Sequence, residues 1–343
     1  MSNFWHNIQT PNFSLAPMED VTDTSFRELI LQSSETNKLH LLFSEFTSVE
    51  GMCHPVGRGK VKHRLQINES EKKLLKEKNV KLIAQIWGKD PEKYYKTAQY
   101  ITNETDFDGI DINMGCPVKN VVKNGCCSAL IDQPNLAKEI ILATKESTNL
   151  PLSVKTRIGF KQVVTESWIS HLLTTPIDAF TIHGRIQKQM SEGLADWNEI
   201  AKAVQLRNEL APQIKIIGNG DVDSYQEGLD KCKKYGVDGV MIGRGIFKNP
   251  WFFQPDKTNM AMEEKLALLQ EHTRLFDKTW GNSKNFAILR RFFKIYTNEF
   301  RGASSLRNNL MNTSNADEVY NAVRLFVQNS ELSHMSQQNT FPD

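Results

Sequence analysis

A cysteine on a shaped turn is the first feature of this sequence that could perform chemistry. Cys116 follows an apolar stretch that predicts a strand ending at Asn113, and Pro117 comes directly after it. Proline lacks an amide hydrogen and has a fixed φ, so no helix starts there. A single cysteine usually behaves as a small buried hydrophobic residue. The Asn-Met-Gly-Cys-Pro turn instead favours a functional thiol on a loop that follows a strand.

Apolar stretches alternate with helix-like segments along most of the chain. The predicted strands are Phe13–Met18, Leu39–Phe46, Val80–Trp87, Gly109–Gly115, Leu152–Gly159, Ala179–Gly184, Ile214–Asp221 and Gly239–Gly245. The predicted helices between them include Thr24–Gln32, Pro91–Thr102, Pro134–Ser147, Ser167–Leu173, Asp196–Ala203 and Ser224–Tyr235. This alternation is typical of a parallel sheet that is covered on both faces. Eight such units in about 250 residues predict an α/β fold, a (β/α)₈ TIM barrel.

Polar or charged groups stand at the end of nearly every predicted strand. They are Glu19, Asp20, Glu45, Gln85, Asn113, Cys116, Lys155, Arg157, His183, Arg185, Asn219, Asp221 and Arg244. A charge that is buried without a partner is costly. Chance could explain two or three such strand ends, but not all eight. Strand ends meet at one mouth of a barrel, where the active sites of this fold lie.

Two glycine-rich turns follow the last two strands, in Ile216–Asp221 and Val240–Gly245. Glycine lets backbone N–H groups approach a ligand closely, and these two loops often bind phosphate in barrels. Arg244 could add a charge-assisted hydrogen bond. Two tight turns that need glycine only for positive φ are the alternative. The pair of turns favours a phosphorylated cofactor such as FMN.

Four of the strand-end residues suit a flavin ring. Lys155 and His183 can stabilise the negative charge of a reduced flavin. Gln85 both donates and accepts, which matches the pyrimidine edge of the ring. Asn219 completes this predicted set.

The strand–helix rhythm stops after Phe253. Residues 257–329 predict only helices, namely Met262–Lys278, Asn285–Phe300, Ser304–Met311 and Ala316–Val327, and residues 330–343 predict a flexible polar tail. Six cations crowd one part of the helical region: Lys284, Arg290, Arg291, Lys294, Arg301 and Arg307. Such a face can position an RNA backbone. A solvated face is an equally good interpretation. We therefore predict a catalytic barrel over residues 1–253 and an RNA-recognition domain over residues 257–329.

Composition sets broad limits on the protein. Its 343 residues carry a net charge of +2, which neither requires nor excludes nucleic acid. The five cysteines are odd in number and form no Cys-x-x-Cys pair, so we predict no disulfide framework and no metal site. No apolar run approaches ~20 residues, which predicts no membrane span. The N-terminus lacks the pattern of a signal peptide, so we expect a cytoplasmic protein.

Several motifs together resemble those of the tRNA-dihydrouridine synthases, of the bacterial, FMN-dependent type. The matching stretches are Leu15–Asp23, Asp111–Pro117, Val154–Gly159, Thr181–Arg185, Gly218–Asp221 and Met241–Gly245. They occur in the family's order between residues 13 and 253. The combination of Asn-x-Gly-Cys-Pro, His-Gly-Arg and Asn-Gly-Asp is specific, whereas Gly-Arg-Gly alone is weak. Cys126 and Cys127 depart from the pattern, since the family usually has small residues there.

The resemblance implies a flavoprotein that reduces uridine in tRNA to 5,6-dihydrouridine, with NADPH as the reductant of FMN. By position, FMN would be held by Ala16, Pro17, Met18, Gln85, Lys155, His183, Asn219, Gly220, Asp221, Gly243 and Arg244. Asn113 and Arg157 would contact the uracil, and Cys116 would be the general acid. Hydride would pass from the flavin to C6, Arg157 would stabilise the enolate, and Cys116 would protonate C5. Cys116 must then be a thiol and not a strongly depressed thiolate. We expect a monomer.

Three other functions remain open from the sequence. The same barrel could reduce a small molecule with FMN and have no RNA substrate. It could perform the same chemistry on ribosomal RNA. It could also be an RNA-folding helper that has kept FMN without turnover.

Overall fold

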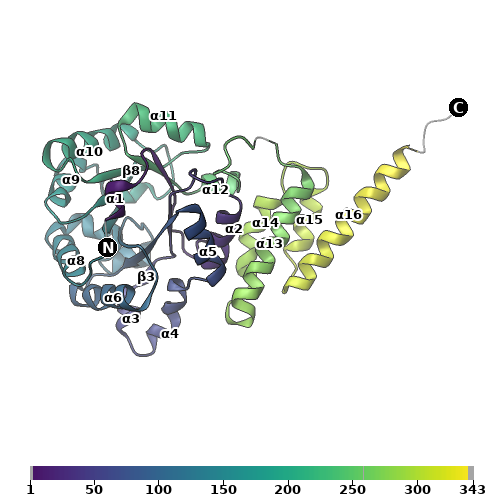
Figure 1. The fold of residues 1–343 in the computed structure, drawn as a ribbon, viewed down its shortest axis with the longest axis horizontal. Coiled ribbons are helices and arrows are strands. Elements are labelled where there is room, and N and C mark those ends of the chain that lie inside the picture. The colour runs from purple at the N-terminus through teal and green to yellow at the C-terminus, as the bar shows by residue number, and fades with distance from the viewer. Residues whose placement is uncertain (1–2, 258, 339–343) are drawn as a thin grey trace.

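The computed structural model describes residues 3–257 and 259–338, and its centre is a closed parallel barrel (Figure 1). Its strands are β1 (Asn12–Leu15), β2 (Leu41–Phe43), β3 (Thr47–Ser48), β4 (Lys81–Trp87), β5 (Gly109–Met114), β6 (Leu152–Arg157), β7 (Ala179–His183), β8 (Lys215–Asn219) and β9 (Gly239–Ile242). They follow the order β2-β1-β9-β8-β7-β6-β5-β4, and pairing between β2 and β4 closes the barrel. The two-residue β3 continues the path of β2 along β4. The predicted TIM barrel is confirmed.

Helices surround the barrel and fill the connections between its strands. Their bounds are α1 (Phe4–Asn7), α2 (Thr24–Gln32), α3 (Val49–Cys53), α4 (Gly57–Val61), α5 (Glu69–Lys78), α6 (Pro91–Glu104), α7 (Lys119–Lys123), α8 (Pro134–Glu146), α9 (Thr165–Leu173), α10 (Trp197–Leu210), α11 (Tyr225–Tyr235) and α12 (Gly245–Lys248). Short 3₁₀ segments are η1 (Lys62–Leu65), η2 (Cys127–Asp132) and η3 (Gln187–Gln189). Local sequence explains the main boundaries. Asp90 caps α6 through the N–H groups of Glu92 and Lys93, and Gly236 ends α11 in the left-handed region at φ 71°.

Several strands are shorter than the sequence predicts. β1 ends at Leu15, not at Met18, because Pro17 has no N–H for a ladder bond. β9 ends at Ile242 because Gly245 already begins α12. The register still aligns the polar strand ends: Asn113 lies opposite Lys155, and His183 lies opposite both Arg157 and Asn219. The barrel therefore gathers these residues at one mouth.

The chain continues as a helical part beside the barrel, shown in green and yellow in Figure 1. It consists of α13 (Met262–Trp280), η4 (Gly281–Ser283), η5 (Phe286–Leu289), α14 (Arg290–Tyr296), α15 (Ala303–Leu310) and α16 (Ala316–Gln338). The single helix predicted over Asn285–Phe300 is wrong. The helix stops at Tyr296, where the Thr297 hydroxyl binds the Phe293 carbonyl, and Gly302 then turns the chain at φ 82°. α16 also continues to Gln338, so residues 330–338 are helical, and 339–343 of the predicted tail lie outside the described residues.

The helical part packs directly on the barrel. α13 lies against α2, and the Phe26 ring lies 5.1 Å from that of Phe292 and 5.4 Å from that of His272. The His272 ring in turn bonds the Tyr296 hydroxyl at 2.9 Å. One apolar core runs through both parts. The division into two domains near residue 255 stays a prediction.

No helix among the described residues is long and apolar enough to cross a membrane.

A buried ion pair joins α2 to α5, which lies in the segment between β3 and β4. Arg27 on α2 donates to Glu71 on α5, with the Nε–Oε1 distance at 2.6 Å, and both side chains are fully buried. Removing one partner leaves a buried charge alone, so Glu71→Ala is expected to lower the free energy of unfolding by about 3–5 kcal/mol. Chemical denaturation measures this loss.

Glu69 on the same helix provides the control for Glu71. It is exposed and pairs with Lys72 at 2.8 Å, so Glu69→Ala is expected to cost about 1 kcal/mol or less. Equal losses for the two variants would contradict the structural importance of the buried pair.

Candidate functional site

The turn that carries Cys116 is built by Asn113. The Asn113 Oδ1 atom accepts the N–H groups of Gly115 at 3.0 Å and Cys116 at 2.9 Å. Its Nδ2 atom donates to Gln85 at 2.9 Å. Asn113 thus orients the thiol loop, and one amide hydrogen is left for the uracil contact that the resemblance implies.

Asp111 orients Gln85 from inside the barrel, a role that the sequence did not indicate. Gln85 Nε2 donates to Asp111 at 2.7 Å, and the Ser153 hydroxyl donates to the other oxygen at 2.6 Å. Burial raises the pKa of Asp111 to about 6, although both donors and Lys155 oppose the rise. Gln85 therefore has a fixed amide orientation, which a directional contact to a ring edge requires.

Cys116 has a second thiol beside it. A hydrogen bond from Cys127 lowers the pKa of Cys116 to about 7, against the effect of burial, and Arg157 and Lys155 lower it further. Ser128 holds the two cysteines together, because its hydroxyl binds the Cys116 carbonyl at 2.8 Å and its N–H binds it at 3.4 Å. Cys127 itself adopts φ 55° and is buried. The expectation of a protonated Cys116 thiol therefore holds below about pH 7.

Arg157 lies beside the thiol and is anchored by backbone carbonyls. Its Nε atom donates to Gly115 at 2.7 Å, and its Nη1 atom donates to Ile186 at 3.2 Å and Met190 at 3.0 Å. The Nη2 atom has no hydrogen-bond acceptor within residues 3–257 and 259–338. Burial lowers the pKa of Arg157 to about 10, so the group stays cationic at neutral pH. A fixed cation with one unused donor can stabilise an oxyanion.

Lys155 and Asn219 meet across the barrel mouth. Lys155 Nζ donates to Asn219 Oδ1 at 3.1 Å, and Asn219 Nδ2 donates to the Met241 carbonyl at 2.8 Å. Burial and the neighbouring Arg157 lower the pKa of Lys155 to about 8. One ammonium hydrogen is used, so two remain for a ligand.

His183 and Arg244 belong to a network around Asp221. Arg185 donates to both Asp221 oxygens at 2.7 and 2.6 Å and lies 3.0 Å from His183 Nε2. Arg244 Nη2 donates to Asp221 at 3.1 Å. Burial and the nearby cations hold the pKa of His183 well below its usual value, so its ring is neutral. The Asp221 carboxylate thus holds two arginines in place, and its predicted part in holding FMN stays a prediction.

The glycine turns and the loop after β1 lie next to each other. The Ala16 N–H binds the Ile242 carbonyl at 2.8 Å, and a Cβ on Gly243 would meet only Ala16 Cβ, at 3.9 Å. Neither Gly243 nor Arg244 donates its N–H to an acceptor in the described part of the chain. Gly220 sits at φ 121°, where a side chain is strained. Free N–H groups, open space and Arg244 fit a flavin phosphate, and Lys155 and His183 fit its ring. Gln85 is fully buried between Asp111 and Asn113, so its predicted contact with the ring stays a prediction.

Comparison with known proteins identifies the family. A sequence model described as "Dihydrouridine synthase (Dus)" matches residues 14–332. A probable tRNA-dihydrouridine synthase of Staphylococcus aureus (strain COL) is 43% identical over 319 residues, which is 92% of this chain and 93% of the relative. The chain belongs to the dihydrouridine synthase family. Bacillus subtilis (strain 168) has a probable tRNA-dihydrouridine synthase 2 that is also 43% identical, covering 92% of this chain and 94% of the relative.

A solved structure agrees on the fold alone. The complex of 2-naphthoyl-CoA reductase with 2-naphthoyl-CoA aligns with a TM-score of 0.51 and 10% identity. The alignment covers 71% of this chain and 49% of the other.

The six cations between Lys284 and Arg307, which the sequence predicts to form one basic face, have different surroundings in the structure. Lys284 and Arg291 bind acidic residues of the barrel. Arg290 donates to the Thr313 carbonyl and Arg307 to the Thr297 carbonyl. The two remaining residues, Lys294 and Arg301, are exposed. Lys284 and Arg290 therefore do not share an exposed face with Arg291, Lys294 and Arg301, and the RNA-contacting role of this region stays a prediction.

Cys127→Ala tests the effect of the second thiol. Without its hydrogen bond, the pKa of Cys116 is expected to rise from about 7 towards the ordinary ~8.5. The pH midpoint of Cys116 alkylation by iodoacetamide, followed by mass spectrometry, should then move upward.

Cys126→Ala is the matched control for this shift. The Cys126 thiol bonds the Asn124 carbonyl at 3.8 Å, so this variant should leave the midpoint unchanged. An unshifted midpoint in Cys127→Ala would show that Cys127 does not tune the thiol.

Proposed function

We propose that this protein reduces uridine in tRNA to 5,6-dihydrouridine, with FMN as its bound cofactor and NADPH as the reductant. The observation that carries the proposal is the meeting of Cys116, Arg157 and Lys155 at the barrel mouth of a family member. The relatives' names supply the RNA class. Action as a cytoplasmic monomer belongs to the same proposal.

The flavin would be held by residues from several strand ends. Free N–H groups of Gly243 and Arg244, with the Arg244 side chain, would bind the phosphate. Ala16, Pro17 and Met18 would line one side of the ring, and Gln85, Lys155, His183, Asn219 and Gly220 would contact its polar edge. When bound, FMN supplies the hydride for the pyrimidine C6 position.

The protein's own side chains would stabilise the negative charge on the uracil and supply the proton for C5. Arg157 would donate to the C4 oxygen of uracil, where negative charge builds as C6 is reduced. Its three anchoring carbonyls keep the guanidinium fixed, so no reorganisation is needed during the reaction. Asn113 would orient the uracil. The Cys116 thiol would then donate its proton to C5, and the resulting thiolate is stabilised by Cys127 and Arg157.

A uridine within folded RNA must leave its stack to reach this mouth, which costs a few kcal/mol. Contacts to the RNA backbone would offset that cost. Such contacts depend on ionic strength because they release counterions. Binding of a tRNA transcript is therefore expected to weaken as salt rises.

The test is turnover with defined components. Purified protein, FMN, NADPH and an unmodified tRNA transcript should yield dihydrouridine, detected by mass spectrometry of the digested RNA. A ribosomal RNA transcript and free uracil serve as competing substrates. Product on ribosomal RNA or uracil alone would contradict the tRNA assignment, and RNA binding without NADPH oxidation would contradict an enzymatic role.

A further inference from the structure

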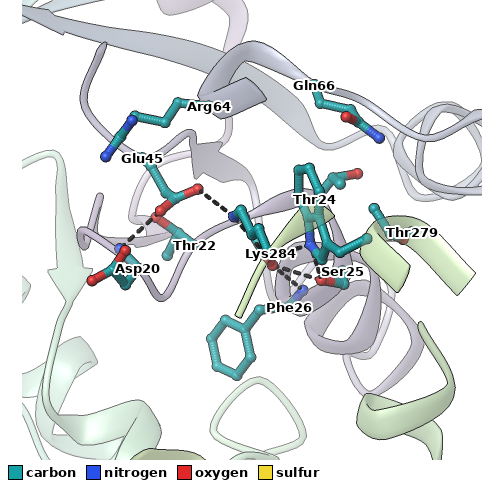
Figure 2. A network of polar contacts seen from close by, with 12 residues as sticks. Asp20, Thr22, Thr24, Ser25, Phe26, Glu45, Arg64, Gln66, Thr279 and Lys284 are labelled. Atoms are coloured by element: carbon teal, nitrogen blue, oxygen red, sulfur yellow. Dashed lines mark hydrogen bonds and ion pairs between the residues drawn. The ribbon is translucent and has the colours of Figure 1, made fainter. Parts of the chain in front are cut away.

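A lysine of the helical part extends to Glu45 and the start of α2 (Figure 2). Lys284 lies between α13 and α14, and its Nζ atom is 3.3 Å from Asp23 Oδ2 and 3.3 Å from Glu45 Oε2. The ammonium also lies 4.0 Å from the centre of the Trp280 ring. The side chain is 10% exposed. Lys284 is thus a buried cation that two carboxylates and an aromatic face enclose.

The two carboxylates depend on that cation. Asp23 and Glu45 are 8% and 1% exposed. Burial raises the pKa of Glu45, and Lys284 opposes the rise while Asp23 and Glu19 add to it. Asp23 has other donors, including Trp280 Nε1 at 2.7 Å and the Phe26 N–H at 3.0 Å. Glu45 depends more on Lys284, because a buried carboxylate that loses its cation is strongly disfavoured.

The second oxygen of Glu45 holds the loop after β1. Glu45 Oε1 accepts the Asp20 N–H at 2.8 Å. Asp20 has φ 54°, a left-handed conformation that is uncommon outside glycine, although aspartate adopts it more readily than most residues. Asp20 lies in the loop between β1 and α2, which begins with Ala16, Pro17 and Met18, the proposed contacts of the flavin ring. A chain of direct contacts therefore runs from Lys284 through Glu45 to this loop.

Two arginines also bind Glu19 and Asp20 in the loop after β1. Arg64 binds the Glu19 carboxylate. Arg291 on α14 donates to the carbonyls of Glu19 at 3.4 Å and Asp20 at 3.2 Å, and to the Asp20 carboxylate at 3.2 Å. Carboxylate oxygens of Glu19, Asp20 and Glu45 lie within 4.8 Å of one another, a grouping that could hold a metal ion. In this protein Arg64, Lys284 and Arg291 pair with these three carboxylates, and the ion pairs hold the loop after β1 in place.

We propose that Lys284 is a positioning residue for the flavin: by holding Glu45, it holds Asp20 and with it the loop Ala16–Met18. The helical part thereby contributes to the cofactor site without touching it. This inference rests on the proposed flavin function. Its first readout, however, is the order of the loop in protein without flavin.

Hydrogen exchange at the Asp20 amide measures the contact itself, by NMR or by mass spectrometry of the peptide that contains it. Lys284→Met keeps an apolar stem against Trp280 and removes the charge. Loss of a charge-assisted hold on the acceptor should speed exchange about tenfold or more. Lys294→Met is the control, since Lys294 is an exposed cation of α14 with no ion pair among the described residues. It should leave Asp20 exchange unchanged.

A double variant tests whether Lys284 acts through Glu45. Glu45→Ala removes the acceptor and should speed exchange at least as much as Lys284→Met. Adding Lys284→Met to Glu45→Ala should then have no further effect, since the two residues form one path. Unchanged exchange in Lys284→Met, or additive effects in the double variant, would overturn the proposal. Lys284→Arg, which keeps a cation, should restore slow exchange. Core amides of the barrel strands should stay protected in Lys284→Met, which separates local loss from global unfolding.

Flavin affinity is the second readout. Lys284→Met should weaken FMN binding about tenfold, as measured by fluorescence quenching, while Lys294→Met stays within twofold. If the unsubstituted protein binds no FMN, the flavin function fails, and the exchange result still decides whether Lys284 positions the loop. Lys284→Met could speed Asp20 exchange and still leave FMN affinity unchanged. That result would overturn the positioning role towards the flavin.

Discussion

Cys116→Ala is expected to slow dihydrouridine formation by about 10²–10⁴-fold and to leave FMN bound. The thiol is the group at this mouth that can both donate a proton and be left as a stabilised anion, because Cys127 and Arg157 favour its thiolate. None of the proposed flavin contacts passes through the sulfur. Mass spectrometry of digested tRNA measures product, and the visible absorbance of the purified protein measures flavin.

A control separates this effect from general loss of a thiol. Cys53 is also partly exposed, but its sulfur contacts the Lys93 carbonyl at 3.7 Å on the outer helices. Cys53→Ser should turn over normally. A Cys116→Ala protein that forms dihydrouridine at the normal rate would remove Cys116 as the acid. Loss of flavin in that variant would instead assign the thiol a role in binding.

The charges at the mouth explain why an anionic ligand suits it. Lys155, Arg157 and Arg185 converge there, and each lies close enough to lower the pKa of a neighbour. Asp111 and Asp221 offset only part of this charge, and Asp221 is committed to Arg185 and Arg244. A set of buried cations is costly on its own. A phosphate, a reduced flavin or an enolate would relieve that cost, which is how the site can favour charge development.

The barrel could be predicted from sequence because its causes are local. Apolar strands, Pro17 and the glycines of the last two turns each act within a few residues. These local features determine where the strands end, and the strand ends determine where the polar side chains meet. Lys155, Arg157 and Asn219 were therefore predictable as neighbours, since parallel register alone brings them to one mouth.

Contacts between distant segments were not predictable in the same way. Lys284 and Arg290 share a pattern with exposed cations. Only the fold shows that Lys284 meets Glu45, which lies 239 positions away. Cys127 stood out only as an unusual residue near Cys116, because the hydrogen bond between the two thiols depends on how the intervening turn closes. Asp111 read as part of an apolar strand, and its role depends on Gln85 from the neighbouring strand.

Lys155→Met is expected to raise the stability of the flavin-free protein and to lower its activity. The half-buried ammonium has a pKa of about 8, well below the value of about 10.5 in an unfolded chain. Because the folded state binds this proton less tightly than the unfolded chain does, the charge lowers the free energy of unfolding at pH values below about 8. The full loss is about 3 kcal/mol. Methionine removes that cost and loses one hydrogen bond to Asn219, worth about 1 kcal/mol. The flavin-free variant should therefore unfold at a higher denaturant concentration at pH 7.

The same substitution should weaken the flavin site. Lys155 is the proposed cationic donor to the flavin ring, so FMN affinity should fall and turnover should drop about 10²–10³-fold. In the unsubstituted protein, FMN affinity should also fall as pH rises through about 8, where the ammonium deprotonates. That pH step should vanish in Lys155→Met. A variant with normal flavin affinity and normal turnover would refute the role of Lys155, and a variant that is destabilised at pH 7 would refute the cost assigned to its half-buried charge.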